Sequence, residues 1–269
     1  MSEIYTVRDA RGAEQPLLVS VPHAGTAFPA ELREVFKPDF VRQPVDTDWF
    51  VDTLYDFAPD MGMKLVSARL SRYVVDLNRN PGGAALYGDG RIITDVLPTT
   101  SFAGEELYRG EPPDATERER RLNNYFTPYH DFLAAELRRL RAKFKHVLLW
   151  DCHSIKHFVP TIRPEAFPDL ILGDADGTSA AHSLSATALE LLRRDADFPV
   201  AHNTPFKGGY ITRSFGRPDE GVHALQLEMT QHMYMNETTT RYDEARAEQM
   251  RMRLRSVFKA LTNVLKELP

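Results

Sequence analysis

Short apolar runs, bounded by turn-forming residues, recur along the chain. A run of about four to eight apolar residues between such breakers is typical of a strand buried inside a sheet. The pattern predicts strands over residues 17–21, 64–67, 73–77, 146–150, 170–172 and 222–229.

A second pattern, in which apolar residues recur three and four positions apart, predicts helices. It runs over 117–144, where Pro128 predicts a kink or a break, and it returns over 178–194 and over 250–265. A shorter helix is expected over 49–57. Between 80 and 113 the chain is rich in Gly, Pro, Thr and Asp, which predicts a long loop. Loops of that length in compact domains are often functional.

Strands that alternate with long helices indicate the fold class. They predict an α/β fold, in which a layered mixed sheet is flanked by helices on both faces. The sequence shows no low-complexity linker, charge block or internal repeat, so we expect one domain spanning residues 1–269.

Composition and charge narrow the classes of partner. The 269 residues carry a formal net charge of −5, which argues against a nucleic-acid or anionic-membrane partner. Cys152 is the only cysteine, which excludes an internal disulfide and favours a reducing compartment. The first residues lack a signal-peptide pattern, and no apolar run approaches the ~18 residues of a membrane-spanning helix. We expect a cytoplasmic protein that acts on a small molecule, and the sequence leaves open whether it forms a homo-oligomer.

Three polar side chains stand at the ends of predicted strands or inside them: His23, His153 and Glu228. Ligands of α/β sheets gather at the carboxyl ends of strands. Two histidines and one carboxylate form a common zinc site that keeps a fourth position for water. A third ligand could come from Asp46 or Asp48, and the other of these two acids would cap the helix predicted to follow. Burying Glu228 in an apolar strand costs several kcal/mol unless it is paired or hydrogen-bonded.

Other residues compete for these roles. His223 alternates to the face opposite Glu228, and His232 lies beyond the predicted strand, so both rank below His23 and His153 as ligands. Cys152 points away from His153 if the strand persists, and is expected in the core.

Two further segments suit an anionic ligand. In the first, Asn78 and Arg79 follow a predicted strand, and a guanidinium suits bidentate recognition of a carboxylate. An ion pair between Arg79 and Asp76 is the structural alternative. The second segment, PFKGGYITR, joins two glycines that permit close backbone approach to polar side chains, although a plain glycine-rich turn would look the same.

Taken together, six segments resemble the N-formylglutamate amidohydrolase (N-formylglutamate deformylase) family, over nearly the whole chain and in the same order. They are VPHAGTAFP, DTDWFVDTLYDFA, SRYVVDLNRNP, LLWDCHS, PFKGGYITRSFG and GVHALQLEMTQHMYM. The family is distantly similar to zinc carboxypeptidases and aspartoacylase, so the resemblance implies a zinc-carboxypeptidase-like sheet with metal ligands at its strand ends.

The resemblance also implies roles for single residues. His23 and His153 would be metal ligands, and Glu228 the catalytic base. The relatives carry a His-x-x-Glu ligand pair, whereas Thr26 stands at the position of the acid here. The third ligand must therefore come from elsewhere, and Asp48 is preferred to Asp46.

The implied activity is metal-dependent hydrolysis of N-formyl-L-glutamate, a step of histidine degradation, with zinc as the default ion. The resemblance implies Asn78 and Arg79 as carboxylate binders. Tyr210, Thr212 and Arg213 of the glycine-containing segment are further substrate-binding candidates, and Arg72 ranks below them. Two alternatives stay open: another N-acyl amino acid deacylase of the aspartoacylase type, and a non-catalytic carboxylate-binding protein.

Overall fold

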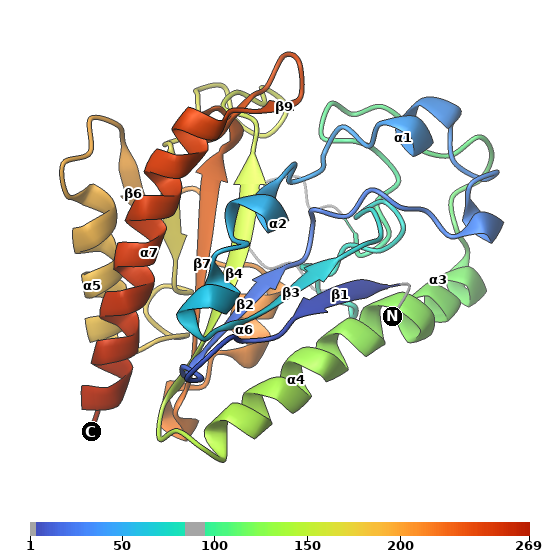
Figure 1. Ribbon diagram of the computed structural model, residues 1–269. Coiled ribbons are helices and arrows are strands. Elements are labelled where there is room, and N and C mark those ends of the chain that lie inside the picture. Colours follow the sequence, from blue (N-terminus) through green and yellow to red (C-terminus); the bar gives the residue numbers. More distant parts are fainter. Residues whose placement is uncertain (1–3, 84–94) are drawn as a thin grey trace.

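A seven-stranded mixed sheet forms the centre of the computed structural model, which describes residues 4–83 and 95–269 (Figure 1). The strands are β1 (Tyr5–Arg8), β2 (Leu17–Val21), β3 (Lys64–Ala68), β4 (Val147–Ile155), β5 (Leu170–Gly173), β6 (Val200–His202) and β7 (Val222–Thr230). Their order is β1-β3-β2-β4-β7-β5-β6. Strands β3, β2, β4 and β7 run parallel, while β1 and β5 are antiparallel to their neighbours β3 and β7.

Helices cover both faces of this sheet. The α-helices are α1 (Pro38–Arg42), α2 (Val51–Leu54), α3 (Ala115–Arg121), α4 (Thr127–Arg141), α5 (His182–Arg193), α6 (Tyr210–Phe215) and α7 (Glu244–Glu267). Helices α5 and α7 pack on one face with α2, and α4 and α6 pack on the other (Figure 1). The predicted α/β layered mixed sheet is confirmed.

Shorter elements complete the chain. They are the 3-10 turns η1 (Ala30–Leu32), η2 (Ala58–Met61), η4 (Pro218–Glu220) and η5 (Gln231–Met233), the π-helical segment η3 (Leu122–Phe126) and the hairpin of β8 (Met235–Asn236) and β9 (Arg241–Tyr242). Among the described residues, no helix is both long enough and apolar enough to cross a membrane.

Most predicted elements are present, with shifted ends. The predicted strands over 17–21, 64–67, 170–172 and 222–229 correspond to β2, β3, β5 and β7. Strand β4 runs on to Ile155 instead of ending at Trp150, because its pairing with β7 continues through nine consecutive residues. The long helix near 117–144 is confirmed as α3, η3 and α4 in succession. Pro128 does not break it, because the helix widens into the π-helical segment η3 just before the proline, where the Thr127 amide bonds to the Leu122 carbonyl.

The strand predicted over 73–77 is wrong. Tyr73, Val74, Val75 and Leu77 are buried, but the chain here turns, since the Val74 amide bonds to the Ser71 carbonyl. This buried apolar run has the sequence pattern of a strand but forms turns. The described parts of 80–113 contain no helix or strand longer than an isolated bridge, in line with the predicted loop, and residues 84–94 lie outside the described chain.

Two predicted helices are shorter than expected. Helix α5 begins at His182 instead of 178, because Ala175 and Asp176 take positive φ angles of 54° and 57° in the preceding turn. The helix predicted over 49–57 is reduced to α2, and its N-terminal neighbour Phe50 has a φ of 61°. No side chain caps α2, so neither Asp46 nor Asp48 has the predicted capping role.

Strand alternation places the polar residues of interest on one face. In β4, Trp150 and Cys152 point into the core beneath α5 and α7, so His153 faces the α4 and α6 side. Glu228 is the register partner of His153 on β7 and shares that face. The expectation that Cys152 belongs to the core is confirmed.

Candidate active site

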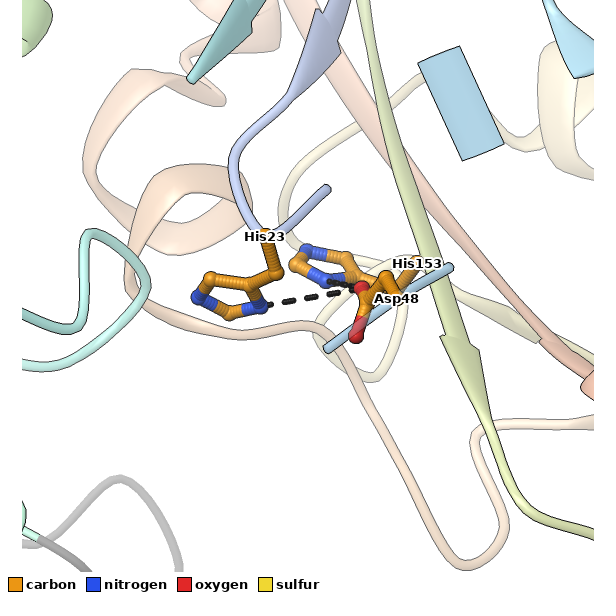
Figure 2. A group of neighbouring side chains, drawn as sticks. All are labelled: His23, Asp48 and His153. Carbon is orange, nitrogen blue, oxygen red and sulfur yellow. Dashed lines mark hydrogen bonds and ion pairs between the residues drawn. The ribbon is translucent and has the colours of Figure 1, made fainter. Parts of the chain in front are cut away.

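His23, Asp48 and His153 converge at the carboxyl ends of β2 and β4 (Figure 2). His23 follows β2 by two residues, His153 stands inside β4, and Asp48 comes from the loop before α2. The Asp48 Oδ2 atom lies 3.2 Å from His153 Nδ1 and 3.7 Å from His23 Nδ1. All three residues are buried, and their candidate ligand atoms lie within 4.8 Å of one another. These residues could hold a metal ion.

The outer ring nitrogens of both histidines contact carboxylates. His23 Nε2 lies 2.8 Å from Asp76 Oδ1, and His153 Nε2 lies 3.0 Å from Asp151 Oδ2. Histidines that bind metals usually donate their other ring N–H to such a group, which fixes the tautomer and the ring orientation. In a neutral ring held in this way, the Nδ1 atom that faces Asp48 is unprotonated, which is the form that ligation requires.

His23 Nδ1 provides the test of fit to a metal. It is buried and has no hydrogen-bond partner. An unsatisfied buried polar atom costs about 1–3 kcal/mol, and a bound cation would remove that cost. A tetrahedral ion with bonds of about 2.0–2.1 Å separates its ligand atoms by about 3.3 Å. The two Asp48 distances bracket that value, so the three residues fit a small divalent ion.

The electrostatics of the cluster also favour a cation. Burial opposes ionisation of Asp48, but the neighbouring rings of His153 and His23 outweigh it and hold the pKa of its carboxyl well below the usual range. Burial likewise opposes ionisation of Asp76, whose pKa is held low chiefly by the charge of Arg72. Two ionised carboxylates, both within 4 Å of Arg72, thus lie in a buried site.

Glu228 lies next to His153 across the β4–β7 pair and is only 9% exposed. Burial raises the pKa of the Glu228 carboxyl to about 8, and the charge of Asp48 adds to this effect. A carboxyl group that titrates near neutral pH is suited to accept and return a proton.

Asn78 holds the start of α6 against the site. Its Oδ1 accepts a hydrogen bond from the Ile211 amide at 2.8 Å, and its Nδ2 lies 2.9 Å from His153 Nε2 and 3.4 Å from Gln226 Oε1. Because His153 Nε2 carries one proton or none, it donates to Asp151 or accepts from Asn78, but not both. A Cβ on Gly209 would meet the Asn78 amide at 2.2 Å, so this glycine permits close approach to Asn78.

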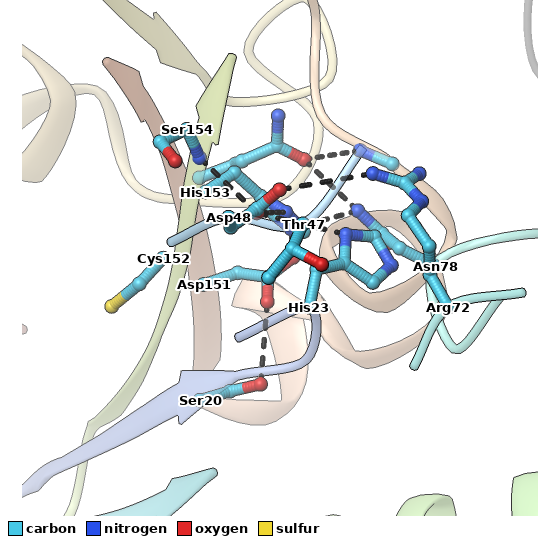
Figure 3. A network of polar contacts seen from close by, with 12 residues as sticks. Ser20, His23, Thr47, Asp48, Arg72, Asn78, Asp151, Cys152, His153 and Ser154 are labelled. Atoms are coloured by element: carbon cyan, nitrogen blue, oxygen red, sulfur yellow. Dashed lines mark hydrogen bonds and ion pairs between the residues drawn. The ribbon is translucent and has the colours of Figure 1, made fainter. Parts of the chain in front are cut away.

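The two arginines of the SRYVVDLNRNP segment differ in exposure. Arg72 is 7% exposed and donates to Asp76 Oδ2 at 2.6 Å, and its NH1 atom lies 3.7 Å from Asp48 Oδ1 (Figure 3). Arg79 is 24% exposed, donates to the Asn78 carbonyl at 3.2 Å and reaches Asp76 Oδ2 at 4.0 Å. The ion pair between Arg79 and Asp76, which was the alternative to a substrate-binding role, is thus present with a long separation of 4.0 Å.

The other candidate substrate residues lie on α6. Tyr210 is partly buried, and its ring packs at a tilt against His130 and Phe126, with ring centroids 5.5 and 5.9 Å away. Arg213 Nε donates to the Gly208 carbonyl at 3.0 Å. Thr212 is fully buried, and its hydroxyl has no hydrogen-bond partner.

Residues that were ranked lower lie apart from this cluster. Asp46 Oδ2 accepts a hydrogen bond from the Phe102 amide at 2.8 Å. His223 faces away from Glu228, as predicted, and its ring lies 3.2 Å from His146 Nδ1. His232 contacts Asp169 instead, at 2.9 Å.

Sequence reasoning missed several contacts of the site. Gln226 and Asp151 stand two residues before Glu228 and His153, and strand alternation alone would have placed them on the same face. Gln226 Oε1 accepts the Gly209 amide at 2.7 Å. The Ser154 amide donates to Asp48 Oδ2 at 3.1 Å (Figure 3), and Tyr234 donates to Ser154 Oγ at 2.8 Å. Nothing local in the sequence points to Tyr234.

Comparison with known proteins identifies the family of the chain. Residues 15–235 match the model of the N-formylglutamate amidohydrolase family. The chain belongs to this family. It is 41% identical over 238 residues to an N-formylglutamate deformylase of Pseudomonas aeruginosa, an alignment that covers 88% of this chain and 87% of the relative. A Pseudomonas putida protein of the same name is 39% identical over 248 residues, covering 91% and 92%.

Solved structures show the same fold. The crystal structure of N-formylglutamate amidohydrolase from Ralstonia eutropha superposes with a TM-score of 0.81 at 26% identity, covering 98% of both chains. A gene product of Agrobacterium tumefaciens superposes with a TM-score of 0.74 at 18% identity, covering 97% of this chain and 96% of the other, and supports the fold alone. The family resemblance stated from the six sequence segments is confirmed.

Proposed function

We propose that this protein hydrolyses N-formyl-L-glutamate to formate and L-glutamate, and that it needs one divalent ion, by default zinc, held by His23, Asp48 and His153. The relatives named N-formylglutamate deformylase, which match over most of both chains, support the substrate. One observation supports the metal above all others: the buried Nδ1 atom of His23 has no hydrogen-bond partner and faces Asp48 and His153.

The chemistry is divided between the ion and the chain. A divalent ion at this site would lower the pKa of water and polarise the formyl oxygen. Glu228 would take the proton of the attacking water and return it to the nitrogen of the leaving amine. Its position beside His153, and a pKa near neutrality, support both proton transfers.

Asp76 and Asp151 would keep the histidine rings in place during turnover. Each carboxylate contacts the Nε2 atom of one histidine, so each ring presents Nδ1 to the centre of the site. Arg72 would balance the charges of Asp48 and Asp76, which both lie within 4 Å of its guanidinium. We also propose that the Arg72 guanidinium, which lies beside Asp48, contacts the substrate directly.

Substrate recognition must neutralise two carboxylates. Arg79 is partly exposed beside the site, and its fork suits bidentate contact with one of them. Asn78 would help to orient the same group. Tyr210 and Arg213, on α6, would contact the other carboxylate, and Thr212, on the same helix, would bond to the substrate through its buried hydroxyl, which has no hydrogen-bond partner.

Formate release provides the test. Purified protein is supplied with N-formyl-L-glutamate, and in parallel with N-acetyl-L-aspartate, the type of substrate that an aspartoacylase-like enzyme would cleave. We expect rapid formate release from the first and little acetate release from the second. A preference for the acetylated substrate would indicate an aspartoacylase-like enzyme instead. Binding of either substrate without hydrolysis would indicate a carboxylate-binding protein.

A further inference from the structure

A second group of metal-ligand side chains lies outside the proposed active site. His157 follows β4, Asp169 precedes β5, and His232 lies in η5, just after β7. We infer that these three residues form a second binding site for a divalent transition-metal ion. The ion would be a structural one, distinct from the ion held by His23, Asp48 and His153.

The distances in this cluster suit a small ion. His232 Nε2 lies 2.9 Å from Asp169 Oδ1, and His157 Nδ1 lies 3.5 Å from the same oxygen. The ligand atoms of a tetrahedral zinc site are about 3.3 Å apart. His157 Nδ1 is also a buried atom with no hydrogen-bond partner, as His23 Nδ1 is in the first site.

The protein holds both histidines in place through their backbones. A single oxygen, Glu237 Oε1, accepts the amide of His157 at 2.8 Å and the amide of His232 at 3.0 Å. Thr230 donates its hydroxyl to Asp169 Oδ1 at 2.9 Å, and its amide to the Asp169 carbonyl, also at 2.9 Å. Four separate segments are thus fixed around one point, which is the preorganisation that a metal site requires.

An ordinary ion pair explains this geometry less well. One protonated histidine would suffice to pair with Asp169, yet two imidazole rings converge there, with centroids 4.3 Å apart. Two protonated rings at that distance would repel each other. A single cation shared by two neutral rings and one carboxylate removes the repulsion.

The donor set selects the kind of ion. Imidazole suits zinc, cobalt, nickel and copper, whereas magnesium and calcium prefer oxygen ligands. The side chains of His157 and His232 are 39% and 35% exposed, so water can complete the coordination.

Such an ion would hold in place a chain segment that lines a cavity next to the first site. The residues that line this cavity of about 320 Å³ include Asp46, Ser154, Lys156, Phe158 and Val159. His157 stands between the lining residues Lys156 and Phe158 in the sequence. Ser154, another of the lining residues, donates its amide to Asp48 of the first site at 3.1 Å.

Metal counting on tag-free protein tests the inference. Protein is stripped with a chelator and titrated with Zn²⁺ by calorimetry, and the bound ion is counted by elemental analysis. We expect two equivalents for the wild type and one for His232→Gln. His182→Gln removes a histidine at the exposed start of α5 and should still bind two. His157→Gln should repeat the loss if His232→Gln folds poorly.

The His153→Ala background separates the second site from the first. In that variant we expect one remaining equivalent that raises the Tm, and we expect both the ion and the Tm shift to disappear when His232→Gln is added. The inference would be overturned if the wild type, His232→Gln and His157→Gln all bound two equivalents. It would also be overturned if the wild type bound one equivalent that only His153→Ala removes. If the wild type binds a single ion that only His232→Gln removes, the second site stands and the proposed first site fails.

Discussion

His153 and Glu228 are register partners on the neighbouring parallel strands β4 and β7, and both side chains emerge on the face covered by α4 and α6. The pairing places a candidate metal ligand and a candidate proton carrier side by side without any loop between them. Sites built on strands hold their geometry more precisely than sites on loops. Substitutions at these two positions should therefore have separable effects, one on metal binding and one on turnover.

Glu228→Gln should keep the metal and lose at least ~10²-fold in kcat, the low end for acid–base catalysis. The amide has nearly the same shape but cannot accept and return a proton. Steady-state kinetics and metal content are measured on the same preparation. Glu106→Gln, a change at an exposed position, should alter neither. A Glu228→Gln enzyme with near-normal kcat would assign Glu228 a structural role.

Asp151→Asn should weaken metal binding at the first site by about 10- to 100-fold, because an amide orients the His153 ring less firmly than a carboxylate does. The affinity is measured by competition with a chromogenic chelator. Asp46→Asn is the matched control, since its side-chain oxygen can still accept the Phe102 amide and it does not contact the histidines. Equal affinities for both variants would contradict the orienting role of Asp151.

Arg79→Lys should reduce kcat/KM for N-formylglutamate strongly while leaving the metal content unchanged. Lysine keeps the charge but cannot form the bidentate contact. An analogue that is amidated at the contacted carboxylate should be affected far less. Arg217→Lys, at an exposed position, serves as the control. Equal losses for the charged substrate and the neutral analogue would move carboxylate recognition to Arg213 or Arg72.

Acid should destabilise the fold through His130. Burial lowers the pKa of its ring to about 4 from a usual value of 6.5, and the ring contacts the Leu77 carbonyl next to Asn78. Between pH 6.5 and 4 the unfolded chain binds a proton at this position that the native chain does not, so stability falls as the pH falls. At 1.36 kcal/mol per pKa unit, the loss approaches about 3 kcal/mol at pH 4.

Chemical denaturation at several pH values tests this effect. His130→Gln should flatten the acid limb of the stability curve, and the exposed His182→Gln should not. Burial also lowers the pKa of His223 to about 4, so the flattening will be partial. Parallel curves for the wild type and His130→Gln would show that His130 is not the source.

The strand pattern was readable from the sequence because buried apolar runs are local. The residues His23, His153 and Glu228 follow from that pattern, and the resemblance to a family selected Asp48. The contacts that complete the site were not readable, because they join distant segments: Asp76 meets His23 across 53 positions, and Tyr234 meets Ser154 across 80. The false strand at 73–77 has the same origin, since a buried turn satisfies its backbone through contacts that no local pattern reveals.

The central claim is that the ion held by His23, Asp48 and His153 is required for deformylation. The most direct measurement follows formate release from N-formyl-L-glutamate while Zn²⁺ is added stepwise to chelator-stripped protein. Wild-type protein should be inactive before zinc is added, and its activity should rise as Zn²⁺ fills the site of His23, Asp48 and His153. His232→Gln should behave in the same way. His153→Ala should stay inactive at every zinc concentration. Full activity of stripped wild-type protein, or zinc-restored activity in His153→Ala, would contradict the account.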